Sequence, residues 1–144
     1  MPSLRLQHYN IRTTKVDESI RFYADVLGLQ SGYRPVTNRP GAWMYDKTDI
    51  PVVHISGIDL SNPEAMAQLE AHLGKRDLDT LNGSGAIDHI AFEGEDYDAF
   101  RGDLDKKGVA YTARDVPEID LKQLFLVDPN GITVELNFTV PAAR

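Results

Sequence analysis

The chain has 144 residues, 42% of them hydrophobic and 26% charged, which is the length and balance of an ordinary soluble globular domain. The formal net charge is −7 and Lys and Arg form no cluster, which argues against nucleic acid and anionic membrane surfaces as partners. The absence of cysteine excludes a disulfide framework, thiolate metal ligands and a cysteine nucleophile, so any metal ion must be bound by imidazole and oxygen.

Targeting signals are not evident in the sequence. No apolar run approaches the roughly 20 residues of a membrane-spanning helix. Residues 1–5 lack the basic region and apolar stretch of a secretory signal peptide. We therefore expect a cytoplasmic protein whose partner is a small-molecule substrate.

The first half of the chain predicts one strand, one helix and then three strands. Residues 4–11 alternate loosely between apolar and polar types, as a strand does. Apolar residues then recur at steps of three and four as far as Leu27, which predicts a helix, and Gly28 is a typical left-handed helix end. Turn residues separate three short segments that we interpret as strands: 30–35, 41–46 and 51–56.

Residues 58–84 interrupt this order. Asn62 and Pro63 are a good helix start, apolar residues follow at helical spacing, and Gly74 ends the segment. The residues after Gly74 are polar and rich in glycine, as in a linker. We therefore predict a short helix within a connection between two halves.

The second half repeats the order of the first. Residues 86–93 predict a strand, and apolar spacing predicts a helix that begins near Asp96 and ends at Gly108. The remaining strands are expected at 110–116, 121–127 and 132–138, with a tight hairpin turn at 128–131.

Two pairs of residues that bind divalent metals fall at equivalent points of the halves. His89 follows His8 by 81 positions, and Glu135 follows His54 by the same 81. A lone polar residue in a strand usually lies on a solvated face. His54 and Glu135, however, lie between apolar neighbours, where burial leaves an unpaired polar group at a cost of about 1 to 3 kcal/mol. If the halves pack symmetrically, one metal ion would satisfy all four side chains.

This donor set fits iron, nickel, manganese, zinc or cobalt, because imidazole and carboxylate both bind these ions. Two His and one carboxylate form the facial triad of non-haem iron oxygenases. Three His and one Glu would leave two open positions on an octahedral ion, enough for a bidentate oxygen ligand. The residues alone leave both arrangements open.

Several motifs resemble a known family. They are Phe22-Tyr23-Ala24-Asp25-Val26-Leu27-Gly28-Leu29, Asp88-His89-Ile90-Ala91-Phe92, Phe125-Leu126-Val127-Asp128-Pro129-Asn130-Gly131 and Val134-Glu135-Leu136. With the duplicated order of elements, they resemble the vicinal oxygen chelate superfamily, which includes glyoxalase I, extradiol dioxygenases and bleomycin-binding proteins. The resemblance covers about residues 4–138 and selects the superfamily better than any member.

The resemblance implies an α+β fold in a single domain over residues 1–144. Two pseudo-symmetric βαβββ units, at about 4–57 and 85–138, would form a curved mixed sheet around a central cavity, with the linker and its short helix at 58–84. It also implies that His8, His89 and Glu135 are metal ligands. The fourth ligand position falls on His54, which is either a ligand or an acid or base beside the metal.

Six further residues are candidates for binding substrate. Arg12 matches an arginine that glyoxalases use for the glutathione carboxylate. The others are bulky strand residues or polar residues near the proposed ligands, each of which also has a purely structural interpretation: Asn10, Trp43, Tyr45, Gln123 and Asn137.

Three functions remain open at this point. The leading hypothesis is a metal-dependent, glyoxalase-like lyase or isomerase that acts on a small vicinally oxygenated substrate through an enediolate, with Glu135 as the base and His54 as the second candidate. The first alternative is an Fe(II) or Mn(II) extradiol-type ring-cleaving dioxygenase. The second is a protein that sequesters a small molecule without catalysis. A homodimer is expected, because each unit offers an open sheet that needs covering.

Overall fold

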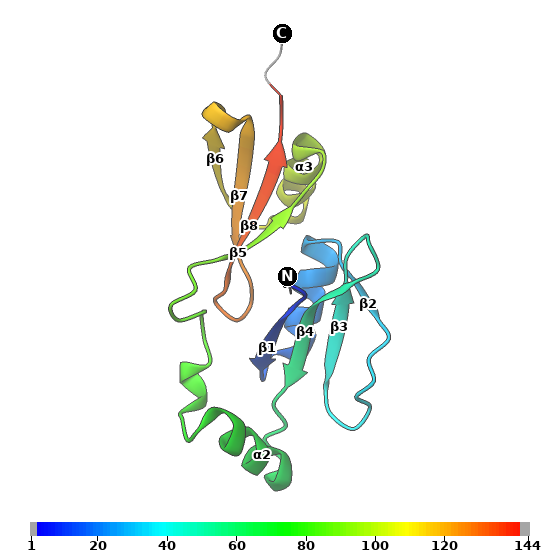
Figure 1. Cartoon of the computed structure of the whole chain (residues 1–144), viewed down its shortest axis with the longest axis vertical. Coiled ribbons are helices and arrows are strands. Elements are labelled where there is room, and N and C mark those ends of the chain that lie inside the picture. The colour runs from blue at the N-terminus through cyan, green and yellow to red at the C-terminus, as the bar shows by residue number, and fades with distance from the viewer. Residues whose placement is uncertain (1–2, 142–144) are drawn as a thin grey trace. The chain divides into compact units, whose positions relative to one another are not determined.

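A computed structural model describes residues 3–141 of the chain (Figure 1). These residues form two compact units, and the boundary between them falls after Leu81. The linker helix therefore belongs to the first unit. The two units are described separately below.

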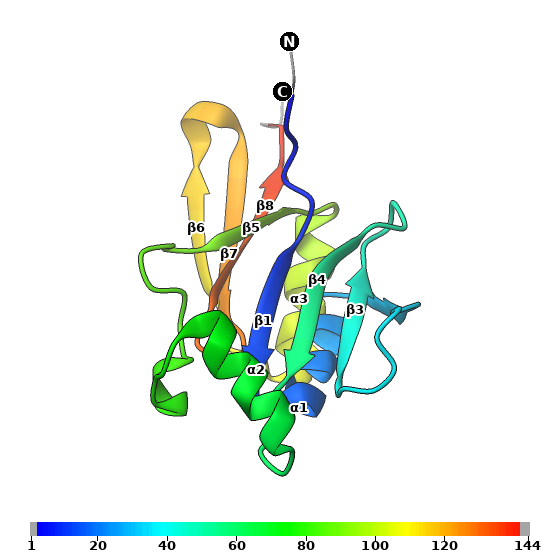
Figure 2. The ribbon, with the colours of Figure 1, turned by 60° about the horizontal axis from the view of Figure 1, so that its bottom comes forward.

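The first unit is a four-stranded mixed sheet with its helices. The sheet has the order β1-β4-β3-β2, and the parallel pairing of β1 with β4 is visible in Figures 1 and 2. In chain order its elements are β1 (Tyr9–Thr13), α1 (Val16–Arg21), a π-helix (Phe22–Val26), β2 (Gln30–Gly32), β3 (Gly41–Tyr45), β4 (Pro51–Gly57), α2 (Pro63–Leu73) and a short 3-10 helix (Leu78–Thr80).

Alternation along the strands gives this sheet two different faces. One face carries the apolar core, which packs under α1: Ile11, Ala42, Met44, Val53 and Ile55, together with Tyr23 of the π-helix, are all buried. The opposite face carries the residues between them, including Trp43 and His54, which are half-buried. The apolar residues thus fix the sheet on its helix and point the polar candidates the other way.

The second unit has the same architecture. Its sheet has the order β5-β8-β7-β6, and again only the outer pair, β5 with β8, is parallel. In chain order its elements are β5 (Ile90–Glu93), α3 (Tyr97–Lys107), β6 (Thr112–Val116), a 3-10 helix (Pro117–Ile119), β7 (Leu121–Val127) and β8 (Thr133–Thr139).

The core of the second unit joins α3 to the two central strands. Leu104 of α3 is fully buried, as are Leu124 of β7 and Val134 of β8. The ring of Phe138 packs against the rings of Tyr97 and Phe100 in α3, with centroids 5.5 and 5.7 Å apart. Hydrophobic burial and edge-on aromatic contacts therefore hold the helix on one face of the sheet.

The strand register confirms the duplication. Asn10 of β1 lies opposite His54, and Ala91 of β5 lies opposite Glu135, so both pairs obey the 81-residue spacing. A register shift in the first unit, where Met44 faces Val53 but the next residue of β3 faces Pro51, gives β4 one extra residue. This extra residue is a β-bulge, and it leaves His54 at its equivalent position opposite Asn10.

Most of the predicted elements are present, but the strands predicted from 110 and 132 begin at Thr112 and Thr133, β2 ends at Gly32 instead of residue 35, and two strands begin four or five residues late. The expected strands at 4–11 and 86–93 begin only at Tyr9 and Ile90. Upstream residues have no partner strand in the sheet, and loose alternation alone does not make a strand. His8 and His89 therefore lie immediately before their strands and not within them.

The predicted helix ends are confirmed. Gly28 and Gly108 both adopt positive φ, at 78° and 66°, directly after helical segments. Asn62 caps α2 by accepting a hydrogen bond from the backbone N–H of Ala65. The first helix differs from the expectation because it widens into a π-helix at Phe22.

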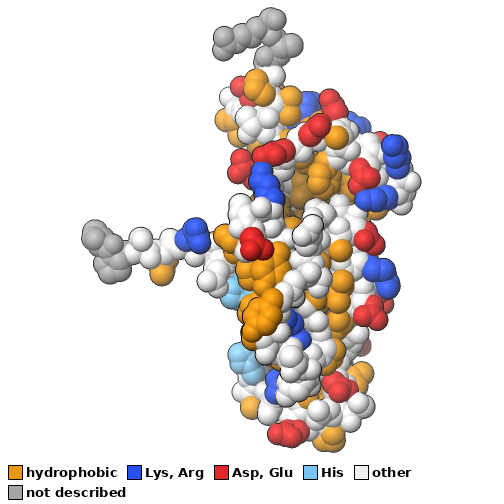
Figure 3. Space-filling model, turned by 90° about the vertical axis from the view of Figure 1, so that its right-hand side faces the viewer, with side chains coloured by type: hydrophobic (Ala, Val, Ile, Leu, Met, Phe, Trp, Pro, Cys, Tyr) orange, Lys and Arg blue, Asp and Glu red, His pale blue; other side chains and the backbone are white. Residues whose placement is uncertain are grey.

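Surface charges are mixed on the face shown in Figure 3, where Lys and Arg side chains lie scattered among Asp and Glu. Within residues 3–141, no helix has the length and apolar character needed to cross a membrane.

Candidate metal centre

The closest pair of predicted ligands lies in the second unit. Glu135 is in β8, a central strand, and only 7% of its surface is exposed. His89 directly precedes β5, whose first residue, Ile90, lies opposite Val134. This parallel pairing places Nε2 of His89 2.9 Å from Oε2 of Glu135. An imidazole nitrogen and a carboxylate oxygen therefore face each other at the edge of the sheet.

Gln123 fixes the other oxygen of this carboxylate. Its Nε2 donates to Oε1 of Glu135 at 2.8 Å and to Oδ1 of Asn137 at 3.0 Å. Gln123 lies opposite Asn137 in the ladder between β7 and β8, and it is itself 8% exposed. The amide thus holds Oε1 in place and leaves Oε2 directed toward His89.

His89 is oriented by the residue before it. Its Nδ1 lies 2.8 Å from Oδ1 of Asp88, while Nε2 faces Glu135. The hydrogen bond with Asp88 raises the pKa of His89 above its ordinary 6.5. Partial desolvation opposes this shift, and the charges of Glu135 and Asp88 add to it. The two carboxylates therefore favour the imidazolium form.

In the first unit, His54 lies between two rings. The ring of His8 stacks on it with centroids 3.8 Å apart, and the ring of Trp43 stacks on it at 4.0 Å. The ring planes are nearly parallel in both stacks, with interplanar angles of 11° and 13°. Burial lowers the pKa of His54, and the nearby charges of His8 and Arg34 lower it further. A hydrogen bond with Pro51 opposes this shift. Its surroundings therefore favour the neutral imidazole.

The hydrogen bonds of His54 leave one nitrogen available. Proline has no N–H, so the ring must donate to the backbone carbonyl of Pro51. Nε2 is buried and has no partner among the described residues, which assigns the donating role to Nδ1. A His with Nδ1–H on a backbone carbonyl and a free Nε2 lone pair is the usual state of a metal ligand.

His8 repeats the arrangement of His89. Its Nδ1 lies 2.8 Å from Oε1 of Gln7, just as Nδ1 of His89 lies 2.8 Å from Asp88. Gln7 and Asp88 are also 81 positions apart. All three candidate histidines thus have Nδ1 engaged by a local oxygen, which directs Nε2 away from that oxygen.

Asn10 and Arg12 lie in β1, next to β4. Asn10 Oδ1 accepts a hydrogen bond from Oγ of Ser56 at 2.8 Å. Arg12 lines a small crevice that leads to α2, where burial and then the nearby Arg39 lower its pKa.

Tyr45 is engaged within the sheet. Its hydroxyl donates to the backbone carbonyl of Tyr33 at 2.6 Å. The Tyr45 ring also covers Gly32, where an added Cβ would lie 2.6 Å from a ring carbon. These contacts give Tyr45 a structural role in joining β3 to β2.

The predicted residues therefore form two clusters, one in each unit. The first comprises His8, His54 and Trp43, and the second comprises His89, Glu135, Gln123 and Asn137. Among residues 3–141 no three His, Asp or Glu side chains form a group that could hold a metal ion. Sequence reasoning did not identify the residues that bind Nδ1 of the histidines, which are Gln7, Asp88 and Pro51. Gln7 and Asp88 obey the spacing of the duplication, which could have revealed both.

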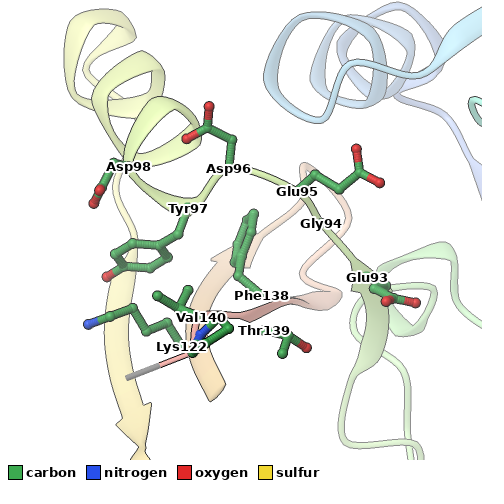
Figure 4. Close-up of a pocket in the computed structure, with 11 residues that line it drawn as sticks. Glu93, Gly94, Glu95, Asp96, Tyr97, Asp98, Lys122, Phe138, Thr139 and Val140 are labelled. Atoms are coloured by element: carbon green, nitrogen blue, oxygen red, sulfur yellow. The ribbon is translucent and has the colours of Figure 1, made fainter. Parts of the chain in front are cut away.

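A separate pocket of about 450 Å³ lies at the other end of the second sheet (Figure 4). The rings of Tyr97 and Phe138 line it, and the Nζ of Lys122 lies 5.2 Å from the Tyr97 ring centroid. Gly94 is required here, because an added Cβ would lie 2.4 Å from Phe138. None of the predicted site residues lines this pocket.

Comparisons with known proteins agree with the fold and the motifs. A sequence model of the glyoxalase/bleomycin resistance protein/dioxygenase superfamily matches residues 5–136. The chain is 31% identical over 137 residues to the protein named Glyoxylase I 4 of Arabidopsis thaliana, an alignment that covers 91% of this chain and 68% of the plant protein.

Solved structures share the fold at lower identity. The lactoylglutathione lyase of Agrobacterium tumefaciens matches with a TM-score of 0.61 at 16% identity, covering 96% of each chain. TnmS3, an antibiotic binding protein from a Streptomyces species, matches with a TM-score of 0.60 at 16% identity, covering 96% of this chain and 98% of its own. The match of the family model over most of the sequence confirms the resemblance: the chain belongs to the glyoxalase/bleomycin resistance protein/dioxygenase superfamily.

Proposed function

We propose that the chain is a divalent-metal-dependent lyase or isomerase that acts on a small molecule with two neighbouring oxygen atoms. His89 and Glu135 are the core ligands, and His8 and His54 are the further ligands, from the first unit of the same chain or of a second copy. The observation that carries the proposal is the 2.9 Å contact between Nε2 of His89 and Oε2 of Glu135, with Gln123 holding the other carboxylate oxygen.

His89 and Glu135 fit two positions around a metal ion. Imidazole nitrogen and carboxylate oxygen bind zinc at about 2.0 to 2.2 Å, so two neighbouring ligands lie about 3 Å apart on an octahedral ion and about 3.4 Å apart on a tetrahedral one. Nε2 of His89 and Oε2 of Glu135 have the octahedral separation. The buried Nε2 of His54 has no partner among the described residues, and a metal would supply one. Three nitrogens and one carboxylate also match the preferences of the first-row transition metals.

The chemistry divides between the metal and the side chains. A bound divalent ion would act as a Lewis acid that polarises the substrate carbonyl and stabilises the enediolate. Glu135 is the proton carrier: Gln123 holds its Oε1, and Oε2, which would have to leave the ion, takes a proton from the carbon next to the carbonyl and returns it to the carbonyl carbon, while the hydroxyl proton moves to the former carbonyl oxygen. One proton leaves and one returns, so the isomerisation needs no oxidant. His54 is the second candidate for this role.

The Arabidopsis relative is named a glyoxylase I, which supports hemithioacetals as the first substrates to test. Protein reconstituted with Ni(II), Co(II) or Zn(II) should isomerise hemithioacetals or epimerise a 2-substituted thioester, and Glu135→Gln should remove that activity. The same panel should include Fe(II)-loaded protein with catechols under oxygen. Oxygen consumption there, with no isomerase activity in any metal form, would replace this proposal with ring-cleaving dioxygenation.

A further inference from the structure

The linker helix α2 has one apolar face, although none of its residues is buried. Met66, Leu69 and Leu73 recur at steps of three and four, so they lie on the same side of the helix. Each of them is half-buried. A surface helix usually buries such a face against a core. Among the residues that the structure describes, the apolar face of α2 is therefore only partly covered.

A groove of about 470 Å³ runs along this face. Leu78 and Leu81 also line it, so the chain turns back along α2 after the helix ends at Gly74, whose φ is 80°. Most of the lining is apolar. The charged side chains in it are Glu70, Lys75 and Arg76, and all three are exposed.

These three charges do not neutralise one another. Within residues 3–141, none of them forms an ion pair. Arg76 instead donates through Nη2 to the backbone carbonyl of Leu73 at 3.0 Å, which uses only one of its five N–H groups. The groove therefore presents an unpaired carboxylate on the helix and two unpaired cations just after the helix end.

We propose that this groove is the contact surface between two copies of the chain. In a two-fold symmetric contact the same patch faces itself, so the patch must carry groups that complement each other. Glu70 stands three positions before Leu73, and Arg76 stands three positions after it. A two-fold axis beside Leu73 therefore brings the two Leu73 side chains together and directs Glu70 of each copy toward Arg76 of the other.

The charges favour a second copy over other occupants of the groove. An anionic amphiphile would meet the carboxylate of Glu70, and a cationic one would meet Lys75 and Arg76. A second copy offers both signs in the reversed order, and each contact occurs twice under two-fold symmetry. The surface lies outside the proposed metal site, so the inference does not depend on that site.

Charge reversal tests this surface, with the dissociation constant of the dimer measured by sedimentation equilibrium on the full chain. Glu70→Arg and Arg76→Glu each place two like-charged pairs in the contact. We expect each variant to weaken the dimer by about tenfold or more, because two attractive pairs become repulsive. The double variant exchanges the two charges and restores both pairs, so it should recover most of the wild-type affinity.

Two further variants complete the experiment. Glu64→Arg makes the same charge change on α2, but Glu64 does not line the groove, so this control should keep the wild-type constant. Leu73→Asp places a carboxylate at the centre of the contact and should weaken the dimer by more than about 100-fold. Recovery in the double variant shows that the single charge reversals act on the contact and not on folding.

Three results would overturn the inference. Wild-type protein that sediments as a monomer at high micromolar concentration would leave the groove to another occupant. A dimer that neither charge reversal nor Leu73→Asp weakens would have its contact elsewhere. A double variant as weak as either single charge reversal would exclude the pairing of Glu70 with Arg76.

Discussion

Nε2 of His89 lies 2.9 Å from Oε2 of Glu135, although the two residues are 46 positions apart. The same interval separates His8 from His54, whose rings stack with centroids 3.8 Å apart. Each contact is produced by the parallel pairing of the first and last strands of a unit. One topological feature, used twice, therefore brings together two residues that can bind a metal in each half.

The first prediction concerns the oxygens that hold Nδ1 of the histidines. Replacing such a partner typically costs about 10 to 100-fold in metal affinity. We expect Asp88→Ala to lower zinc affinity by that amount, and Gln7→Ala to lower it less, because Gln7 carries no charge. A competition titration with a coloured chelator measures both. The control, Glu118→Ala, removes an exposed carboxylate and should bind zinc like wild type.

The second prediction uses Trp43, the single tryptophan of the chain. Its ring lies 4.0 Å from the ring of His54, so an open-shell metal on His54 should quench its emission. Titration with Ni(II) should therefore lower the fluorescence, whereas Zn(II) should change it little. His54→Ala should reduce the quenching. Undiminished quenching in that variant would show that the metal does not bind His54.

The third prediction compares the two equivalent hairpin turns. Asp49 and Gly131 hold the same position after Asp46 and Asp128, and both have positive φ, at 63° and 77°. Left-handed backbone costs a residue with a side chain about 1 to 2 kcal/mol. Asp49→Gly relieves this strain but frees the unfolded chain, so its unfolding free energy should stay within about 0.5 kcal/mol of wild type.

Gly131→Ala is the reciprocal variant. It imposes the strain, and its Cβ would lie 2.8 Å from Oδ1 of Asn82. It should lower the unfolding free energy by about 1 kcal/mol or more. Urea unfolding measures both variants. Equal destabilisation by the two substitutions would contradict the equivalence of the turns.

The fourth prediction concerns acid stability. Burial alone would raise the pKa of Asp46. The pKa is nevertheless lowered below the ordinary 3.8 by hydrogen bonds from the Thr48 side chain and from the backbone N–H groups of Thr48 and Ile50, and by the charge of Lys47. The unfolded chain then binds the proton more readily than the folded one. The stabilisation is present above pH 3.8 and is lost as pH falls through the folded pKa.

Asp46→Asn removes this carboxylate. Its loss of unfolding free energy relative to wild type should be largest at neutral pH and should shrink as the pH falls below 3.8. Urea unfolding at several pH values measures the difference. Glu118→Gln, an exposed position, is the control. A difference between Asp46→Asn and wild type that grows on acidification would contradict the assigned shift.

The sequence predicted the elements well where the signal is local. Gly28 and Gly108 end helical segments through their own backbone freedom, and Asn62 caps α2 with its own side chain. The expected strand at 121–127 matches β7, which the hairpin turn at 128–131 ends. Periodicity, caps and turns act within a few residues, so they can be recognised without the fold.

Strand starts and hydrogen-bond partners depend on residues distant in sequence. Tyr9 begins β1 because Val53 is its first partner, which no local pattern reveals. The widening of the first helix at Phe22 likewise has no signal in the spacing of its apolar residues. Gln123 was a candidate because it is polar and lies beside the hairpin that precedes Glu135, but its hydrogen bond to Glu135 required the ladder between β7 and β8.

The central claim, that one divalent ion is bound through His89 and Glu135, is tested most directly by zinc stoichiometry and affinity at neutral pH. Wild-type protein should bind one equivalent of zinc per chain, and His89→Ala and Glu135→Ala should each weaken binding by more than about 100-fold, since a lost ligand costs more than a lost partner of a ligand. Wild-type protein without zinc affinity, or either variant with wild-type affinity, would contradict the account.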